Sequence, residues 1–422
     1  MKLKLENNGL KKLENSGVIL PFSSVQLDKP TMLKTFAERS INTSAVIDNF
    51  GCLVINLSEI SETIRIWNNY RNELEPFFAD KLIVSDPCSE ITFYAWGENR
   101  KDYLQEAIHP VFKQILTEAN TKNYSSIWLD AFEEKSDIIN FVEKTIDKQS
   151  ILSAALPITP VLETSSPNAL IKLSHEINDE ACAISQNLEK DYFGCYFSLH
   201  GSLLGSDERA GIKLNTIMTK IIDILKKHDN VLLYLKFIDV ESTDSHAIEK
   251  MYNLTKMIDA ITRLRGTEHI NGHNFLFLVG GMTKKFMVVI GKGADSAVEL
   301  MNGKSSIVKP GGFNIKNRSE NFQFGDFYDM NNQVMISYDA AMEYYKKHKV
   351  LPSYTEAAKT VTKEELKSHI KYARIKRLNQ IEARCLEVEQ FRKDIITGQE
   401  RGLQDRLSRS TDAELQQLAT LF

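Results

Sequence analysis

The sequence has no apolar run that approaches the roughly 18–20 residues required to cross a membrane. Its first 17 residues are polar and charged, without the apolar segment of a secretory signal. The five cysteines are scattered along the chain and form no CxxC pair, which argues against a disulfide framework and a cysteine zinc site. We therefore expect a reduced, cytoplasmic protein without membrane association.

Two further signatures are missing. The turns between predicted strands and helices contain no GxGxxG, so dinucleotide binding is not indicated. The net charge of −4 and the pI near 6.2 argue against whole-chain electrostatic binding to nucleic acid and leave only a local basic patch open. The composition, 42% hydrophobic and 26% charged, is typical of a globular protein with one large core.

The segment from Tyr192 to Gly281 alternates apolar runs with amphipathic segments. Three runs predict strands that are apolar on both faces: Tyr192–Gly201, Val231–Val240 and Asn274–Gly281. The two segments between them, 209–228 and 248–261, repeat apolar residues at three- and four-residue spacing and predict helices. This order indicates a parallel sheet that is covered by helices.

The same alternation extends toward the N-terminus. Further strands are predicted at Lys81–Asp86, Ser126–Asp130 and Leu156–Glu163, and a strand pair or a bulged strand at Ala45–Leu57. Units of about 30–40 residues are those of βα elements. The prediction is an α/β protein whose strands form an irregular TIM-like (βα) barrel, not an open nucleotide-binding sheet.

One connection breaks this rhythm. Leu276–Gly281 and Phe286–Ile290 are separated by only four residues, whereas parallel neighbours need a crossover of about a dozen. The sequence therefore predicts an antiparallel hairpin at this point, followed by a short helix at Ser296–Met301.

Three regions are expected: an N-terminal arm and helix (1–44), the barrel-like domain (45–350) and a charged helical extension (360–422). Thr362 and Glu365 form a capping-box pattern in the extension. An apolar stripe follows at near-heptad spacing, and its members are Leu378, Ile381, Cys385 and Val388. Because such a helix is marginal alone, we expect a partner protein or self-association through residues 362–396.

Barrel enzymes place their catalytic groups at the carboxyl ends of the strands. The residues at these predicted ends that we select as catalytic candidates are Asp130, Glu163, His200 and Asp239; Asp86 and Lys236 occupy similar positions. Carboxylates that converge on one histidine could act as an acid–base pair or hold a divalent metal ion, which leaves the cofactor undetermined. The alternative is that acids at strand ends only cap helices or contact solvent.

A second set of residues suggests ligand binding. Its members are Lys236, Gly280, Gly281, Gly291, Lys292 and Gly293. Glycine loops after the last barrel strands, together with a helix N-terminus, form a common phosphate cradle. If the two apolar runs here form a hairpin, the same glycines only make turns.

Five short segments resemble the phage-type Beta-protein family, barrel-like proteins of phages and of bacterial mobile or defence loci. They are Leu82–Pro87 (LIVSDP), Ile158–Glu163 (ITPVLE), Gly194–His200, Leu233–Asp239 and Phe324–Phe327 (FGDF). The resemblance implies a prokaryotic or phage-related setting and no established reaction.

The function expected from these features is a ligand-recognising barrel within a prokaryotic or phage-related assembly, with anti-phage defence as one setting. One alternative is a free-standing metal- or acid–base-dependent barrel enzyme that acts on a phosphorylated or nucleotide-like substrate. A further alternative is a non-catalytic interaction scaffold.

Overall fold

A computed structural model of the protein shows a mixed α/β fold. It describes residues 17–21, 39, 41, 50–57, 65, 68–69, 71–72, 82–87, 89, 93, 123–150, 152–188, 190–240, 247–282, 286–299, 324, 326–332, 334–396, 402–410 and 413–421. Most of the N-terminal region expected over 1–44 lies outside the described residues.

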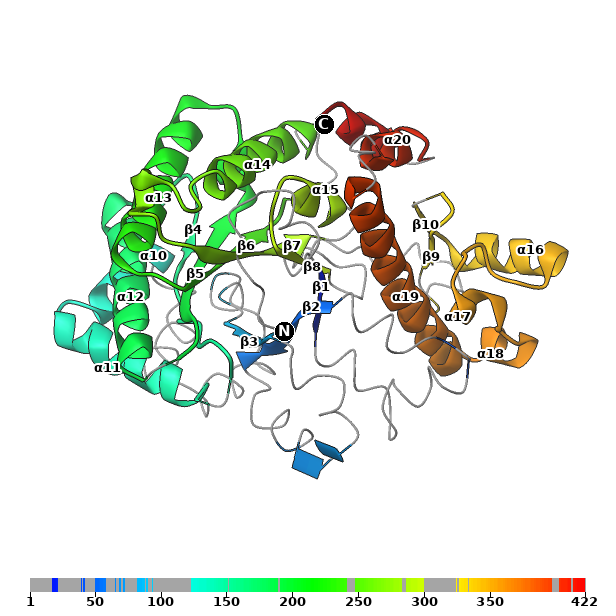
Figure 1. Ribbon diagram of the computed structural model, residues 1–422, viewed down its shortest axis with the longest axis horizontal. Helices are drawn as coiled ribbons and strands as arrows, with labels where there is room; N and C mark the ends of the chain where they lie inside the picture. Colours follow the sequence, from blue (N-terminus) through cyan, green and yellow to red (C-terminus); the bar gives the residue numbers. More distant parts are fainter. Residues whose placement is uncertain are drawn as a thin grey trace.

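Eight strands form one sheet in the middle of the molecule (Figure 1). They are β1 (Gly17–Pro21), β2 (Phe50–Asn56), β3 (Leu82–Asp86), β4 (Val161–Leu162), β5 (Phe193–His200), β6 (Val231–Ile238), β7 (Phe275–Met282) and β8 (Ser296–Glu299). All neighbours are parallel, in the order β3-β2-β1-β8-β7-β6-β5-β4. An isolated parallel bridge joins Val84 in β3 to Ala154, seven positions before β4 begins.

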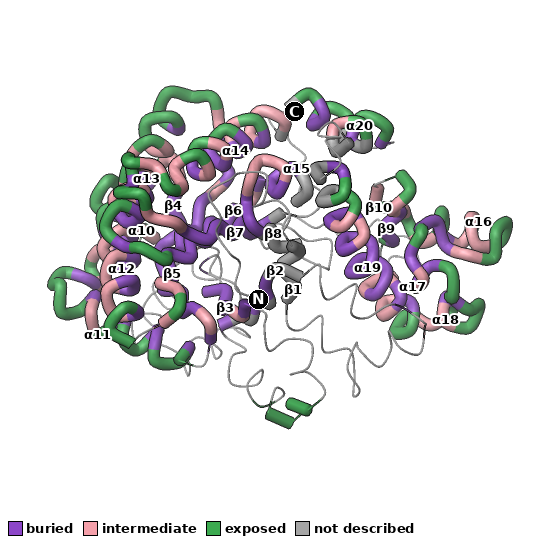
Figure 2. Tube along the Cα trace, viewed as in Figure 1, coloured by how far each residue is buried: buried purple, intermediate pink, exposed green. Residues whose placement is uncertain are grey.

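Helices cover one face of this sheet. They are α10 (Tyr124–Ala131), α11 (Lys135–Asp147), α12 (Asn168–Asn187), α13 (Glu208–Lys227), α14 (Ala247–Thr262) and α15 (Phe286–Gly291). Their buried sides face the strands and their exposed sides form the outer surface (Figure 2). In the described part of the chain, no helix is both long enough and apolar enough to span a bilayer.

The strands bury both of their faces, as their composition predicts. Val231, Leu233 and Leu235 of β6 join the large core beneath the helices, whereas Leu232 and Tyr234 join a smaller core on the opposite face. This alternation is the two-residue period of a β-strand. The smaller core collects side chains from β2, β3, β5, β6 and β7, so its members are contributed around most of the sheet.

A second, two-stranded antiparallel sheet and several helices follow β8. They are β9 (Phe327–Asp329), β10 (Val334–Ile336), α16 (Tyr338–His348), α17 (Glu356–Lys359), α18 (Lys363–Lys367), α19 (His369–Ile396), α20 (Gly402–Ser408) and α21 (Ala413–Leu418). Helix α19 lies between the eight-stranded sheet and α16–α18 (Figure 1).

The apolar stripe of α19 is covered by the chain itself. Leu378, Ile381, Cys385 and Val388 are at most 1% exposed and belong to the large core. On the other side of the helix, Tyr372 and Ile375 pack in a separate core with Phe327 and Leu366. The expectation that a second chain covers this stripe is therefore wrong for these four side chains.

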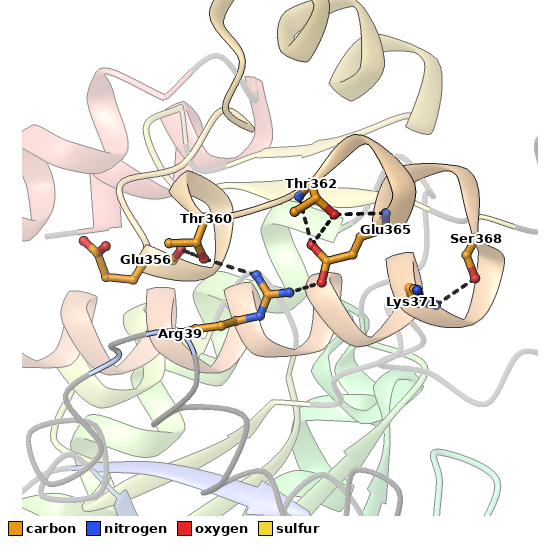
Figure 3. Close-up of polar contacts among 7 residues, drawn as sticks. All are labelled: Arg39, Glu356, Thr360, Thr362, Glu365, Ser368 and Lys371. Carbon is orange, nitrogen blue, oxygen red and sulfur yellow. Dashed lines mark hydrogen bonds and ion pairs between the residues drawn. The ribbon is translucent and has the colours of Figure 1, made fainter.

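The N-terminal and C-terminal regions are tied together at Arg39. Its guanidinium donates to the Thr360 hydroxyl at 3.1 Å and forms an ion pair with Glu365 (Figure 3). Glu365 also accepts from the Thr362 amide at 2.8 Å, while the Thr362 hydroxyl accepts from the Glu365 amide. The predicted capping box is thus confirmed, and it holds a residue that precedes β2.

Three predicted elements are wrong. Ser126–Asp130, expected as a strand, lies in α10, whose N-cap Asn123 accepts from the Ser125 amide at 2.9 Å. Phe286–Ile290 lies in α15, and Ser296, expected to begin a helix, begins β8. Because β7 and β8 pair in parallel, no hairpin forms. The short run 286–290 belongs to a helix in the connection between β7 and β8. The whole connection therefore spans residues 283–295, which is the length of about a dozen residues that a parallel crossover needs.

Of the segment 45–57, the structure describes residues 50–57, which contain β2. Its residues pair with β1 as one strand, and the register shifts between Val18–Phe50 and Ile19–Cys52, so Gly51 is the extra residue. This bulge agrees with the bulged-strand alternative, whereas the first run of the alternative strand pair lies at 45–48, outside the described residues.

Candidate functional site

A buried ion pair lies near the carboxyl end of the sheet. Lys236 follows Leu232 and Tyr234 at two-residue spacing in β6, and Asp86 is the last residue of β3. The Lys236 Nζ lies 2.7 Å from the Asp86 Oδ2, and the two side chains are only 8% and 7% exposed. Strands β3 and β6 are not neighbours, so the pair spans the face of the sheet that lies opposite the helices.

Polar groups of adjacent strands surround this pair. The Tyr234 hydroxyl donates to the same Asp86 oxygen at 3.4 Å. Ser198 stands beside Lys236 in the β5–β6 register, and its buried Oγ has no hydrogen-bond partner among the described residues. A cationic donor, an anionic acceptor and two hydroxyls are therefore gathered on one face of the sheet.

Such a pair is not explained by stability alone. Removing both charges from water costs several kcal/mol per ion, and apolar replacements of buried pairs are often as stable. A charged pair at the strand ends of an α/β sheet, next to an unsatisfied hydroxyl, is instead typical of a functional site.

A second pair lies at the ends of β5 and β6. The His200 Nε2 is 3.7 Å from the Asp239 Oδ2, and the side chains are 19% and 43% exposed. The Ser202 amide donates to the His200 Nδ1 at 3.1 Å. Because an amide nitrogen can only donate, Nδ1 carries no proton, and the neutral ring must carry it on Nε2, facing Asp239.

The backbone at this point is built for close approach. Asp239 has a positive φ of 59°, a conformation that Asp tolerates better than most residues. A Cβ on Gly201 would lie 2.4 Å from the Asp239 carbonyl oxygen. Gly201 therefore leaves room for the Asp239 backbone, and this contact brings Asp239 to His200.

Of the other two predicted catalytic residues, Glu163 lies near this pair and Asp130 does not. Glu163 directly follows β4, and the next residue, Thr164, donates its amide to the Ser202 hydroxyl at 3.3 Å. The segments that carry Glu163, His200 and Asp239 therefore meet at one end of the sheet. Asp130 does not join them, because it lies on the exposed side of α10.

The glycine cradle is not assembled. Gly280 and Gly281 lie near the carboxyl end of β7, whereas Gly291, Lys292 and Gly293 precede the amino end of β8. The two strands are parallel, so these glycines stand at opposite ends of the sheet. A Cβ on Gly280 would lie 2.5 Å from the Tyr234 hydroxyl oxygen, so this glycine makes room for the ring beside Asp86.

Neither thiol nor metal chemistry gains support in the described part of the chain. Burial raises the pKa of the Cys52, Cys182 and Cys195 thiols above the ordinary value, which disfavours the reactive thiolate. No group of three or more His, Cys, Asp or Glu side chains that could hold a metal ion occurs among the described residues.

No family model, curated protein or solved structure matches this chain. The site therefore has to be interpreted from its own residues. Sequence reasoning selected His200, Asp239 and Lys236 but missed Ser198 and Tyr234. The available signal was the two-residue alternation in β6, which places Lys236 in the same row as Tyr234.

Proposed function

We propose that the eight-stranded sheet is a TIM-like barrel. The strand order follows the chain order around a ring, and the Val84–Ala154 bridge lies between β3 and the segment that leads into β4, the two ends of that order. The Lys236–Asp86 contact supports the same conclusion, because two non-adjacent strands can share an ion pair only if the sheet curls. Helix α19 contacts β1, as the last helix of such a barrel would.

The function we propose is recognition of a small polar ligand at the carboxyl end of this barrel. The observation that carries it is the buried Lys236–Asp86 pair beside the Ser198 hydroxyl. Since the pair has no net charge, it suits a ligand with a phosphate or carboxylate oxygen for Lys236 and a hydroxyl or amino donor for Asp86.

A thermal-shift screen tests this proposal. Wild-type protein, Lys236→Met and the exposed control Lys226→Met are heated with phosphorylated sugars, nucleotides, and hydroxy and amino acids. A ligand should raise the unfolding temperature of the wild type and of Lys226→Met but not of Lys236→Met. Equal shifts in all three proteins would place the ligand elsewhere.

The setting follows from the resemblance to the phage-type Beta-protein family. It supports a cytoplasmic component of a prokaryotic or phage-related assembly, in which a partner protein would dock on exposed residues and not on the buried stripe of α19. Affinity purification of the tagged protein from its own host cells, followed by mass spectrometry, tests this setting. Recovery of the chain alone at every salt concentration would argue against an assembly.

An acid–base enzyme is the second candidate, and the His200–Asp239 pair favours it. The Nε2 of His200 lies 3.7 Å from a half-exposed carboxylate, and two such groups side by side can exchange a proton with a bound substrate. If so, turnover of a substrate found by screening should be lost in both His200→Gln and Asp239→Asn. The exposed His269→Gln should retain it. Retained activity in His200→Gln would exclude this candidate.

A further inference from the structure

A groove lies far along the chain from the barrel site. Three segments that are distant in sequence line it: the β9–β10 turn, the C-terminal half of α19 and the two residues that follow α20, with Tyr354 beside them. Its volume is about 500 Å³. This is within the range of small-molecule sites, which is roughly 300–1,000 Å³.

The acidic groups of the groove are already compensated. Glu387 is buried and accepts hydrogen bonds from the Tyr328 hydroxyl and from the Arg384 guanidinium, the latter at 2.8 Å. Glu389 forms an ion pair with Lys393 at 2.7 Å. The exposed Arg409 forms no ion pair with any described acidic side chain, so it is the cation that remains for a ligand.

Several amide groups of the lining remain available. The Nδ2 of Asn332 donates to Asp329 at 2.7 Å and the Nε2 of Gln390 donates to Asp394 at 2.8 Å, which leaves both side-chain oxygens as acceptors. The Asn331 side chain makes no hydrogen bond to a described residue, so its donor and its acceptor are both open.

An aromatic ring completes the set. Tyr354 is 66% exposed at the groove, which leaves a face of its ring for stacking. Neutral amides, an exposed ring and one cation are the groups that recognise a planar heterocycle joined to an anion.

We propose that this groove binds a free mononucleotide. The base stacks on Tyr354, the open amide groups of Asn331, Asn332 and Gln390 pair with its polar edge, and Arg409 binds the phosphate. This site is separate from the barrel site, so it stands or falls without the Lys236 proposal.

Isothermal titration with AMP, GMP, CMP and UMP, with the matching nucleosides and with a six-residue single-stranded RNA tests it. The variants are Tyr354→Ala and Arg409→Ala. Tyr252→Ala and Arg263→Ala, two exposed side chains of α14, are the matched controls. All four positions are on the surface, and circular dichroism verifies that each variant is folded.

We expect Tyr354→Ala to weaken binding of nucleotide and nucleoside at least tenfold. Arg409→Ala should weaken only the nucleotide, and both controls should bind as the wild type does. Absence of binding by all four monophosphates, or equal binding by all variants, would overturn the proposal. Tighter binding of the RNA than of any monophosphate would overturn the assignment to a free nucleotide.

Discussion

The ammonium of Lys236 lies 2.7 Å from the carboxylate of Asp86, although the two residues are 150 positions apart in the chain. They come from strands that are not neighbours in the sheet. The contact therefore requires the sheet to curve, and it places a positive and a negative group side by side at the carboxyl end of the strands.

Breaking this pair on one side should be costly. Lys236→Met or Asp86→Leu leaves the other charge buried and is expected to lower the free energy of unfolding by about 3–5 kcal/mol. The double variant should recover much of that loss, because no buried charge remains. Urea denaturation measures all three. Additive losses in the double variant would show that the two side chains do not act as a pair.

Substitutions at two glycines distinguish the cost of a close contact from the gain in helix propensity. Gly201→Ala places a Cβ 2.4 Å from the Asp239 carbonyl, so we expect a loss of several kcal/mol or displacement of Asp239 from His200. Gly211 lies in α13, where an added Cβ would meet no atom within 4 Å, and Gly211→Ala should stabilise by about 0.5–1 kcal/mol. Denaturation of both variants measures these changes, and a harmless Gly201→Ala contradicts the packing described here.

The tautomer of His200 is open to direct measurement. Nitrogen-15 NMR on histidine-labelled protein should show a neutral ring at high pH with the proton on Nε2, because Nδ1 accepts from the Ser202 amide. The His200→Gln variant assigns the signal. A proton on Nδ1 would mean that this bond is not formed, and it would weaken the acid–base candidate.

The stability of the protein should depend on pH through Asp179. Its hydrogen bond from His228, 2.8 Å long, and then that from Lys227 hold the pKa of this carboxyl well below its usual range. A depressed pKa stabilises the folded state above the unfolded value of about 3.9, and this contribution is lost as the pH falls further.

Asp179→Asn should therefore cost roughly 1 kcal/mol at pH 6–7, a small amount because the carboxylate is partly exposed to solvent. The difference from wild type should shrink below about pH 4. Urea titrations between pH 3 and 7 follow it, and a difference that stays constant over this range would exclude the linkage.

The strands of 192–281 could be predicted closely because their apolar runs are long and are buried on both faces. The runs 126–130 and 286–290 could not, since five residues are too few to show whether the period is that of a strand or a helix. Because 286–290 was predicted as a strand, Gly291 and Gly293 were expected at a strand end, near Gly280 and Gly281. The structure instead places a helix there, so the two groups of glycines lie at opposite ends of the sheet.

The site was predictable only in part, for a related reason. His200 and Asp239 end apolar strands, and strand ends can be found from the sequence. The Lys236–Asp86 pair depends on how the sheet curves, and the open hydroxyl of Ser198 depends on its neighbours. Local sequence contains neither fact.

Native mass spectrometry of protein purified without denaturant tests the central claim most directly. The account predicts that the wild type and Lys226→Met carry one discrete small molecule, which appears as an extra mass and is released on denaturation. Folded Lys236→Met should lack this mass. The same extra mass on Lys236→Met, with its fold verified by circular dichroism, would contradict a ligand site at Lys236 and Asp86.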